Sequence, residues 1–245
     1  MDTTLVTGYI PLQANSLYRS RDKYRELGQR LLDIGLPTIA FVDPSVPMVT
    51  NPAATLQPYT LESCWLINHA RCAKLPPTGN PGKDTAEFHT VQLQKSHWVA
   101  AASVLSPSST FIWLDFGLLH IPGAEPQLVR EFYERVANAN ITKITMASIW
   151  PHLLRNTVWR NHPNWYFAGG AFIVPRDLSL WFANEVQRQT LQILSETGCL
   201  TWEINVWAEI AQRNPDKFTT WPCDHDATIL TGFLGSSECA PISLS

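Results

Sequence analysis

The stretch Phe111-Ile112-Trp113-Leu114-Asp115-Phe116-Gly117 decides the fold of this chain. Its four leading apolar residues are typical of a strand that is buried on both faces of a mostly parallel sheet. Asp115 then lies at the carboxyl end of the strand, where open α/β sheets bind their ligands. Burying a carboxylate there is costly unless a cation or hydrogen-bond donors meet it, although a turn-capping role explains Asp115 equally well. Asp115 is therefore the first candidate site residue.

Length and composition favour one enzyme-like domain. The 245 residues are 45% hydrophobic and 16% charged, so the chain can bury a sizeable core. Ten Trp and 18 Pro suit a loop-rich protein with aromatic-lined clefts. We predict a single domain over residues 1–235 and a loosely held tail over 236–245. The net charge of −3 and the lack of a basic run argue against nucleic acid as the main partner.

The sequence also predicts a cellular compartment. Five cysteines form no C-x-x-C pair and no zinc spacing, which indicates reduced thiols. No signal peptide and no apolar run of about 18 residues is present. We expect a cytoplasmic protein without a membrane span, whose association with a membrane, if any, is peripheral.

The first 43 residues predict a β-α-β unit. Thr4–Ile10 and Thr38–Asp43 are expected strands, and residues 16–34 are an expected amphipathic helix. A right-handed parallel crossover would place Gly8 and Asp43 at the carboxyl edge of the sheet. Asp43 could accept hydrogen bonds from a ribose or a base, but an aspartate before a proline equally makes a turn. The unit carries neither a dinucleotide-binding nor a P-loop glycine pattern.

Further elements follow from periodicity and turn signals. The expected helices are a short one within Leu61–Cys72, then Lys95–Leu105, 126–138, Asp177–Glu196 with Asp177 as N-cap, and 201–213. The expected strands are Phe88–Leu93, Lys143–Trp150 and Trp165–Pro175. Leu75–Thr85 is a long loop, of the kind that often forms a lid or a binding loop. Gly169 and Gly170 interrupt an apolar strand and indicate a bulge or a close approach of the backbone to a ligand.

Two acidic features lie near the end of the chain. Glu203 opens a helix, where the helix dipole alone would favour a carboxylate. Asp224, His225 and Asp226 place three potential metal-binding or acid–base groups side by side, although a polar turn explains them equally well.

In their order, these elements resemble a GT-A-type nucleotide-sugar glycosyltransferase, and more narrowly the HtrL/YibB-like family. The resemblance runs over about residues 4–232. It rests on Leu5–Tyr9, Lys95 with its helix, Trp113–Gly117, Gly169-Gly170 and Thr201–Glu203. It implies a GT-A-like single α/β domain with a mostly parallel central sheet flanked by helices. It also implies a set of nucleotide-sugar-binding residues: Thr7, Gly8, Tyr9, Asp43, Lys95, Asp115, Gly169 and Gly170.

The resemblance further implies a divalent metal, Mn²⁺ or Mg²⁺. Asp115 matches the first acid of the D-x-D pattern that holds the metal on the diphosphate, but Gly117 replaces the second acid. Hard cations need several oxygen ligands, so one carboxylate is not enough. His225 matches a late metal-binding histidine, and Asp224 or Asp226 could compensate for the lost acid.

Two further roles are implied by the same likeness. Glu203 would deprotonate the acceptor hydroxyl in an inverting reaction, or hydrogen-bond the donor sugar in a retaining one. Lys95 would offset the charge of the leaving nucleoside diphosphate.

We therefore expect a glycosyltransferase that moves a sugar from a nucleoside-diphosphate donor, with a UDP-sugar favoured, to a hydroxyl of a glycan or another acceptor. The alternative is a catalytically inactive sugar- or nucleotide-binding module on the same scaffold, motivated by Gly117. A third interpretation is a metal-dependent hydrolase built on Asp115, His225 and Asp224.

Overall fold

A computed structural model describes residues 3–12, 20–150 and 160–242 of the protein. The strands are β1 Thr3–Tyr9, β2 Thr38–Val42, β3 Ala54–Pro58, β4 Thr110–Leu114, β5 Ile144–Ser148, β6 Phe167–Pro175, β7 Phe218–Pro222 and β8 Ala240–Pro241. The α-helices are α1 Arg21–Leu32, α2 Ile67–Ala70, α3 Ala86–Leu105, α4 Pro126–Ala137, α5 Arg176–Thr197, α6 Glu203–Arg213 and α7 Thr228–Thr231.

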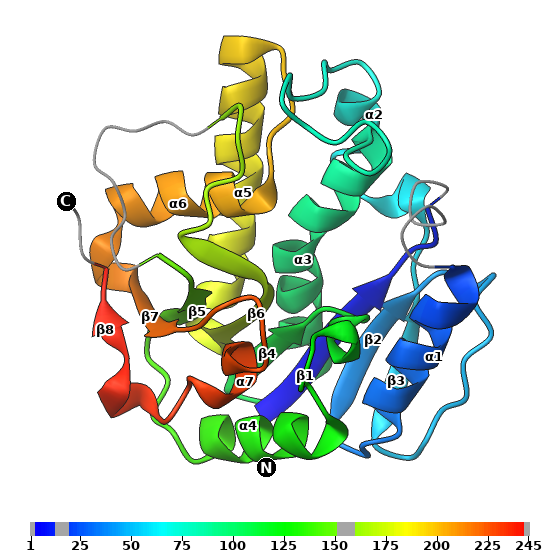
Figure 1. Ribbon diagram of the computed structural model, residues 1–245, viewed down its shortest axis with the longest axis vertical. Helices are drawn as coiled ribbons and strands as arrows, with labels where there is room; N and C mark the ends of the chain where they lie inside the picture. The colour runs from blue at the N-terminus through cyan, green and yellow to red at the C-terminus, as the bar shows by residue number, and fades with distance from the viewer. Residues whose placement is uncertain (1–2, 13–19, 151–159, 243–245) are drawn as a thin grey trace.

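The strands form one central sheet in the order β3-β2-β1-β4-β6-β5-β7-β8 (Figure 1). Among the described strands, the pairs β1–β2, β1–β4, β2–β3 and β5–β7 are parallel. The pairs β4–β6, β5–β6 and β7–β8 are antiparallel. The predicted fold class, an α/β domain with a mostly parallel central sheet flanked by helices, is confirmed.

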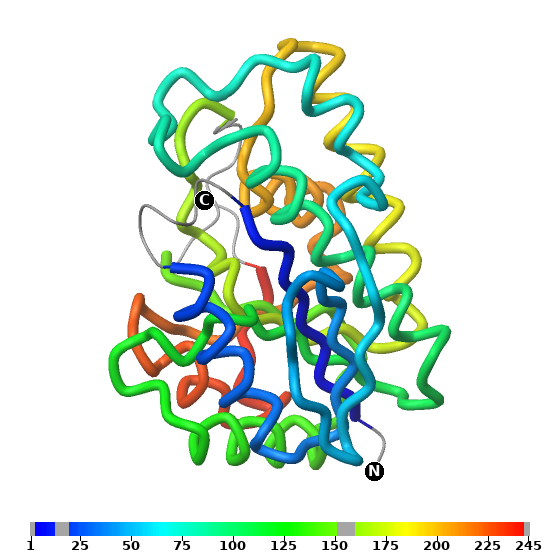
Figure 2. Tube along the Cα trace, turned by 90° about the vertical axis from the view of Figure 1, so that its right-hand side faces the viewer, coloured from blue at the N-terminus to red at the C-terminus, as the bar shows by residue number. Residues whose placement is uncertain are grey.

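Strand β4 lies in the middle of the sheet because both of its faces are apolar. Phe111 and Trp113 belong to the core between the sheet and α3, α5 and α6. Ile112 and Leu114 belong to the opposite core, which α1 and α4 cover. Figure 2 shows these two helix layers on opposite sides of β1. This alternation on two covered faces explains why the strand reads as a continuous apolar run.

The opening β-α-β unit forms as predicted, with β1 and β2 parallel and in direct contact. The side chain of Ser20 caps α1, which begins at Arg21; residues 16–19 of the predicted helix lie outside the described residues. Gly35 has a positive φ of 76° in the turn that follows α1, a conformation that glycine adopts without strain. Strand β3 is an additional edge strand in a segment for which the sequence predicted no strand.

The predicted strand Phe88–Leu93 is wrong, because these residues belong to the single long helix α3. The side chain of Thr85 accepts a hydrogen bond from the Phe88 backbone N at 3.2 Å and so caps a helix that begins nine residues earlier than predicted. Helix α3 packs against both α5 and β1. Apolar residues on several of its sides therefore hid its helical period.

Smaller differences concern element ends. Asp177 lies in the first turn of α5, whereas Pro175 occupies the N-cap position. Leu61–Cys72 holds a 3₁₀ turn, Leu61–Ser63, followed by the short helix α2. In the segment expected to be a loose tail, β8 pairs with β7 and Ile242 is buried. Within the described ranges, no helix has the length and apolar content needed to cross a membrane.

Candidate functional site

A cleft of about 370 Å³ opens where β4 ends, beside the first residues of β6 and the start of α6. The antiparallel pairing brings the start of β6 to the end of β4, and the Asp115 N–H donates to the Gly170 carbonyl at 2.9 Å. Residues from distant parts of the sequence therefore meet here. The predicted site residues that line this cleft are Lys95, Asp115, Gly169, Gly170, Glu203, Asp224 and His225.

Lys95 is the centre of the site. Its Nζ lies 3.0 Å from Asp115 Oδ1, 3.1 Å from Glu203 Oε1 and 2.9 Å from the carbonyl oxygen of Gly169. The side chain is only 3% exposed. A lysine ammonium has three N–H donors, and three acceptors at these distances engage all of them. Lys95 cannot donate to a ligand without giving up one of these contacts.

Burial alone would lower the pKa of Lys95, but the carboxylates of Asp115 and Glu203 outweigh it and raise the pKa above its ordinary value. The Trp113 indole N–H also donates to Asp115 Oδ1, at 2.8 Å. Asp115 thus has both a cation and a neutral donor. The cost of placing a carboxylate beside a buried strand is thereby offset.

Helix α6 fixes the position of Glu203. The glutamate side chain is 8% exposed, and it occupies the first turn of the helix. Ile204, Trp207 and Ile210 bury the same helix in the core. These apolar contacts hold the first turn against the sheet, so the carboxylate is directed at the cleft and at Lys95.

Gly169 is required by the close approach of Glu203. A Cβ atom at residue 169 would lie 2.4 Å from Glu203 Oε1, closer than such atoms approach in proteins. At Gly170 the nearest atom to an added Cβ is Ile229 Cδ1, at 3.1 Å. Gly169 therefore lets the strand backbone lie against the Glu203 carboxylate. The pairing of β5 with β6 also shifts register between Met146 and Ser148, opposite the two glycines, which agrees with the predicted bulge.

We expect Gly169→Ala to lower turnover while the protein stays folded, because the added methyl group pushes the Glu203 carboxylate away from Lys95. Steady-state kinetics and the melting temperature check this result. Gly170→Ala tests whether the effect depends on Glu203, because its methyl group meets the apolar end of Ile229 and should leave the Lys95–Glu203 pair in place. Equal turnover in the Gly169 variant and the wild type would contradict the role given to the glycine.

The glycine that replaces the second acid of the D-x-D pattern has a structural reason. A Cβ atom at Gly117 would lie 2.9 Å from the ring of Tyr24, which α1 brings over this point. Tyr24 stacks on Tyr9 with the ring centroids 5.4 Å apart, and Tyr9 stacks on Phe116 at 5.0 Å. With Tyr24 in this place, a larger residue at position 117 has no room.

The predicted metal-binding residues can be compared by where their side chains lie. Asp115, whose side chain is 37% exposed, and His225 line the same cleft. Asp226 does not line it; its carboxylate accepts hydrogen bonds from Thr228, which lower its pKa. Among the described residues, no group of three or more His, Cys, Asp or Glu side chains could hold a metal ion. Asp115 Oδ1 is already engaged by Lys95 and by the Trp113 indole N–H, so the metal site stays a prediction.

The other predicted nucleotide-binding residues are more dispersed. Gly8 and Tyr9 line a narrower hollow that adjoins the cleft and shares Lys95 and Asp115 with it. Gly8 also makes room for the ring of Trp98, since an added Cβ would lie 2.6 Å from it. Thr7 is fully buried. Asp43 accepts a hydrogen bond from the Ser45 N–H at 2.9 Å, which is the turn role that the sequence left open.

Comparison with known proteins yields structural matches at low identity. The chain matches the crystal structure of mouse xyloside xylosyltransferase 1 in its apo form, with 11% identity, a TM-score of 0.45, and coverage of 89% of this chain and 84% of that chain. It also matches a glycosyltransferase involved in the glycosylation of the major capsid of PBCV-1, with 14% identity, a TM-score of 0.39, and coverage of 89% and 80%. No protein-family model matches, and no curated protein does. The resemblance to the HtrL/YibB-like family is not confirmed.

Sequence reasoning missed much of the cleft wall, including Lys83 and four aromatic residues. The aromatic residues are Tyr24, Phe88, Trp165 and Trp202. The rings of Trp165 and His225 meet edge to face at 4.7 Å. The high tryptophan content indicated an aromatic-lined cleft, but it did not identify which rings line it.

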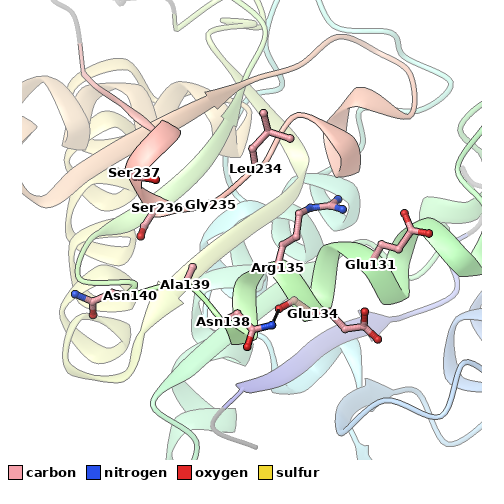
Figure 3. Close-up of a pocket in the computed structure, with 10 residues that line it drawn as sticks. All are labelled: Glu131, Glu134, Arg135, Asn138, Ala139, Asn140, Leu234, Gly235, Ser236 and Ser237. Atoms are coloured by element: carbon pink, nitrogen blue, oxygen red, sulfur yellow. Dashed lines mark hydrogen bonds between the residues drawn. The ribbon is translucent and has the colours of Figure 1, made fainter.

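A larger surface hollow, of about 510 Å³, lies elsewhere, between α4 and residues 234–237 (Figure 3). Glu131 and Arg135 project from α4 at this hollow. The Arg135 guanidinium donates to the backbone oxygens of Leu230, in α7, and Phe233, so its role here is to hold α7 and the residues that follow it. None of the predicted site residues lines this hollow, and we assign the candidate site to the cleft at Asp115.

Proposed function

We propose that the protein transfers a sugar from a nucleoside-diphosphate donor to an acceptor hydroxyl. The observation that carries this proposal is the buried Lys95 that joins Asp115 and Glu203 inside a cleft at the carboxyl end of β4. Two carboxylates held by one cation are costly to assemble in an interior, and such clusters are concentrated at functional sites. A UDP-sugar is the favoured donor and a glycan hydroxyl the favoured acceptor, as the sequence resemblance implies.

The transfer makes one bond and breaks one. The acceptor oxygen bonds to the anomeric carbon of the donor sugar, and the bond from that carbon to the diphosphate oxygen breaks. Its electron pair leaves with the nucleoside diphosphate, and the hydroxyl proton must go to a base. Glu203 lines the cleft. It would take that proton in an inverting transfer, or hydrogen-bond the donor sugar in a retaining one.

Asp115 and His225 would hold a divalent cation together with the diphosphate of the donor. Such a cation, when bound, supplies positive charge against the leaving group. Because these two residues provide too few ligands by themselves, we propose that the cation binds together with the nucleotide.

A ligand screen tests the proposed function. We expect one class of nucleotide sugar, among those of UDP, GDP and dTDP, to raise the melting temperature, and a CMP-sugar, which carries a single phosphate, to have no such effect. Saturation at a hundred times Kd adds about 2.7 kcal/mol of stability. Mn²⁺ alone should have little effect, and Mn²⁺ with the nucleotide should have a larger effect than the nucleotide alone. A protein that none of these ligands stabilises would contradict the proposal.

We expect Asp115→Asn to fold and to lose turnover of the donor, because the change removes a charge and keeps the shape of the side chain. The release of nucleoside diphosphate, with and without acceptor, measures this turnover.

The loss of the second acid at Gly117 motivates the alternative of a binding module without catalysis. Wild-type protein that binds the donor but releases no nucleoside diphosphate under any condition would support the module instead.

A further inference from the structure

The cleft contains a cation for which the proposed transfer has so far assigned no task. Lys83 and Lys95 are the two lysines among the described cleft-lining residues, and no arginine lines it in that part of the chain. All three donors of Lys95 are engaged by protein oxygens. Positive charge placed where negative charge develops is usually the largest single contribution to catalysis. Besides the proposed divalent cation, Lys83 is the lysine among the described cleft-lining residues that can meet the charge of a departing diphosphate without giving up a bond to a protein oxygen.

Lys83 is held at the cleft by its backbone, and its side chain is left exposed. The Lys83 N–H donates to the Asn80 carbonyl at 2.9 Å, and the buried Asp84 carboxylate accepts from the Asn80 N–H at 2.8 Å. Thr85, two residues after Lys83, caps α3. The loop is thus braced by its own hydrogen bonds immediately before a helix.

The contact that Lys83 makes is weak enough to be exchanged for a phosphate. Its Nζ lies over the ring of Phe88, 4.9 Å from the centroid. A cation–π contact at an exposed site contributes only about 0.5–1 kcal/mol. Phe88 itself lines both the cleft and the adjoining hollow at Tyr9. A ligand that spans the two hollows passes this point.

We infer that Lys83 binds the diphosphate of the donor and stabilises it as it leaves. This inference rests on the proposed function. It gives the two lysines different tasks: Lys95 holds Asp115 and Glu203 in place, whereas Lys83 contacts the ligand. Arg21 and Arg25 line a separate hollow near β1 that contains neither Asp115 nor Glu203.

The test compares a nucleoside diphosphate with its monophosphate. Titration calorimetry in buffer with Mn²⁺ measures both affinities, with UDP and UMP first and the guanosine, cytidine and thymidine pairs next. We expect Lys83→Gln to weaken diphosphate binding by about tenfold or more, as loss of a charge-assisted hydrogen bond does, and to change monophosphate binding little. Lys83→Arg should keep the preference for the diphosphate.

Lys74→Gln is the matched control, because Lys74 is an exposed lysine immediately before the loop that carries Lys83 and does not line the cleft. An unchanged diphosphate affinity in Lys83→Gln, or an equal loss for both nucleotides, would overturn the inference and leave the proposed function intact. Wild-type protein that binds none of these nucleotides would overturn both.

Discussion

We expect Glu203→Gln to lower kcat by about 10²–10⁴-fold while donor affinity stays nearly unchanged, if the carboxylate is the general base. Glutamine keeps the size of the side chain and removes only its charge and basicity. Glu203 is buried, lines the cleft and is held by Lys95 at 3.1 Å. An acceptor hydroxyl bound in the cleft could therefore pass its proton to this carboxylate.

Glu209→Gln provides a closely matched control for this variant. Glu209 lies on the same helix, its side chain is also 8% exposed, and it pairs with a cation, with Arg160 Nε 2.9 Å from its Oε1. It does not line the cleft. Both variants should lose some stability, and only Glu203→Gln should lose turnover. Full activity with a lowered melting temperature in Glu203→Gln would show that Glu203 serves only to support Lys95 and the start of α6.

Lys95→Met should strongly destabilise the protein. Breaking a buried ion pair by removing one partner costs about 3–5 kcal/mol, because the remaining charge is left without compensation. In a chain of this size, that corresponds to a fall in melting temperature of roughly 6–20 °C. Here one ammonium serves both Asp115 and Glu203, so its removal leaves two carboxylates near each other.

A second variant separates charge from packing in this experiment. If the lost charge causes the destabilisation, Lys95→Met combined with Glu203→Gln should be more stable than Lys95→Met alone, because the buried carboxylate is then gone. Lys74→Met, at an exposed lysine, should leave the melting temperature almost unchanged. A double variant less stable than Lys95→Met would contradict the electrostatic explanation.

The stabilisation by Lys95 should also have a defined pH range. Its pKa in the folded protein is raised above the ordinary value. Its contribution is therefore fully present below the unfolded-state pKa, about 10.4, and is lost only as the pH rises through the higher folded-state pKa. Titration of Lys95 should therefore not change the difference in unfolding free energy between wild type and Lys95→Met across neutral pH.

The sequence by itself determined the centre of the fold. A run of four apolar residues before Asp115 fixed a buried strand and placed the carboxylate at its end, because burial on two faces requires apolar side chains in both alternate positions. Periodicity also located α1, α4 and α6, each of which has one apolar face and one polar face. The glycines at 169 and 170 indicated a bulge or a close approach to a ligand, but not the contact of Gly169 with the Glu203 carboxylate.

Only the tertiary structure decided how these parts act together. Lys95 and Glu203 are 108 positions apart, and no local period relates residues at such a distance. Helix α3 was partly mistaken for a strand because several of its sides are buried, which removes the amphipathic pattern. Tyr24 closes the space beside Gly117 from another element, and Lys83 reaches the cleft from a loop. Local sequence sets which elements form, whereas the contacts between elements set which charges meet.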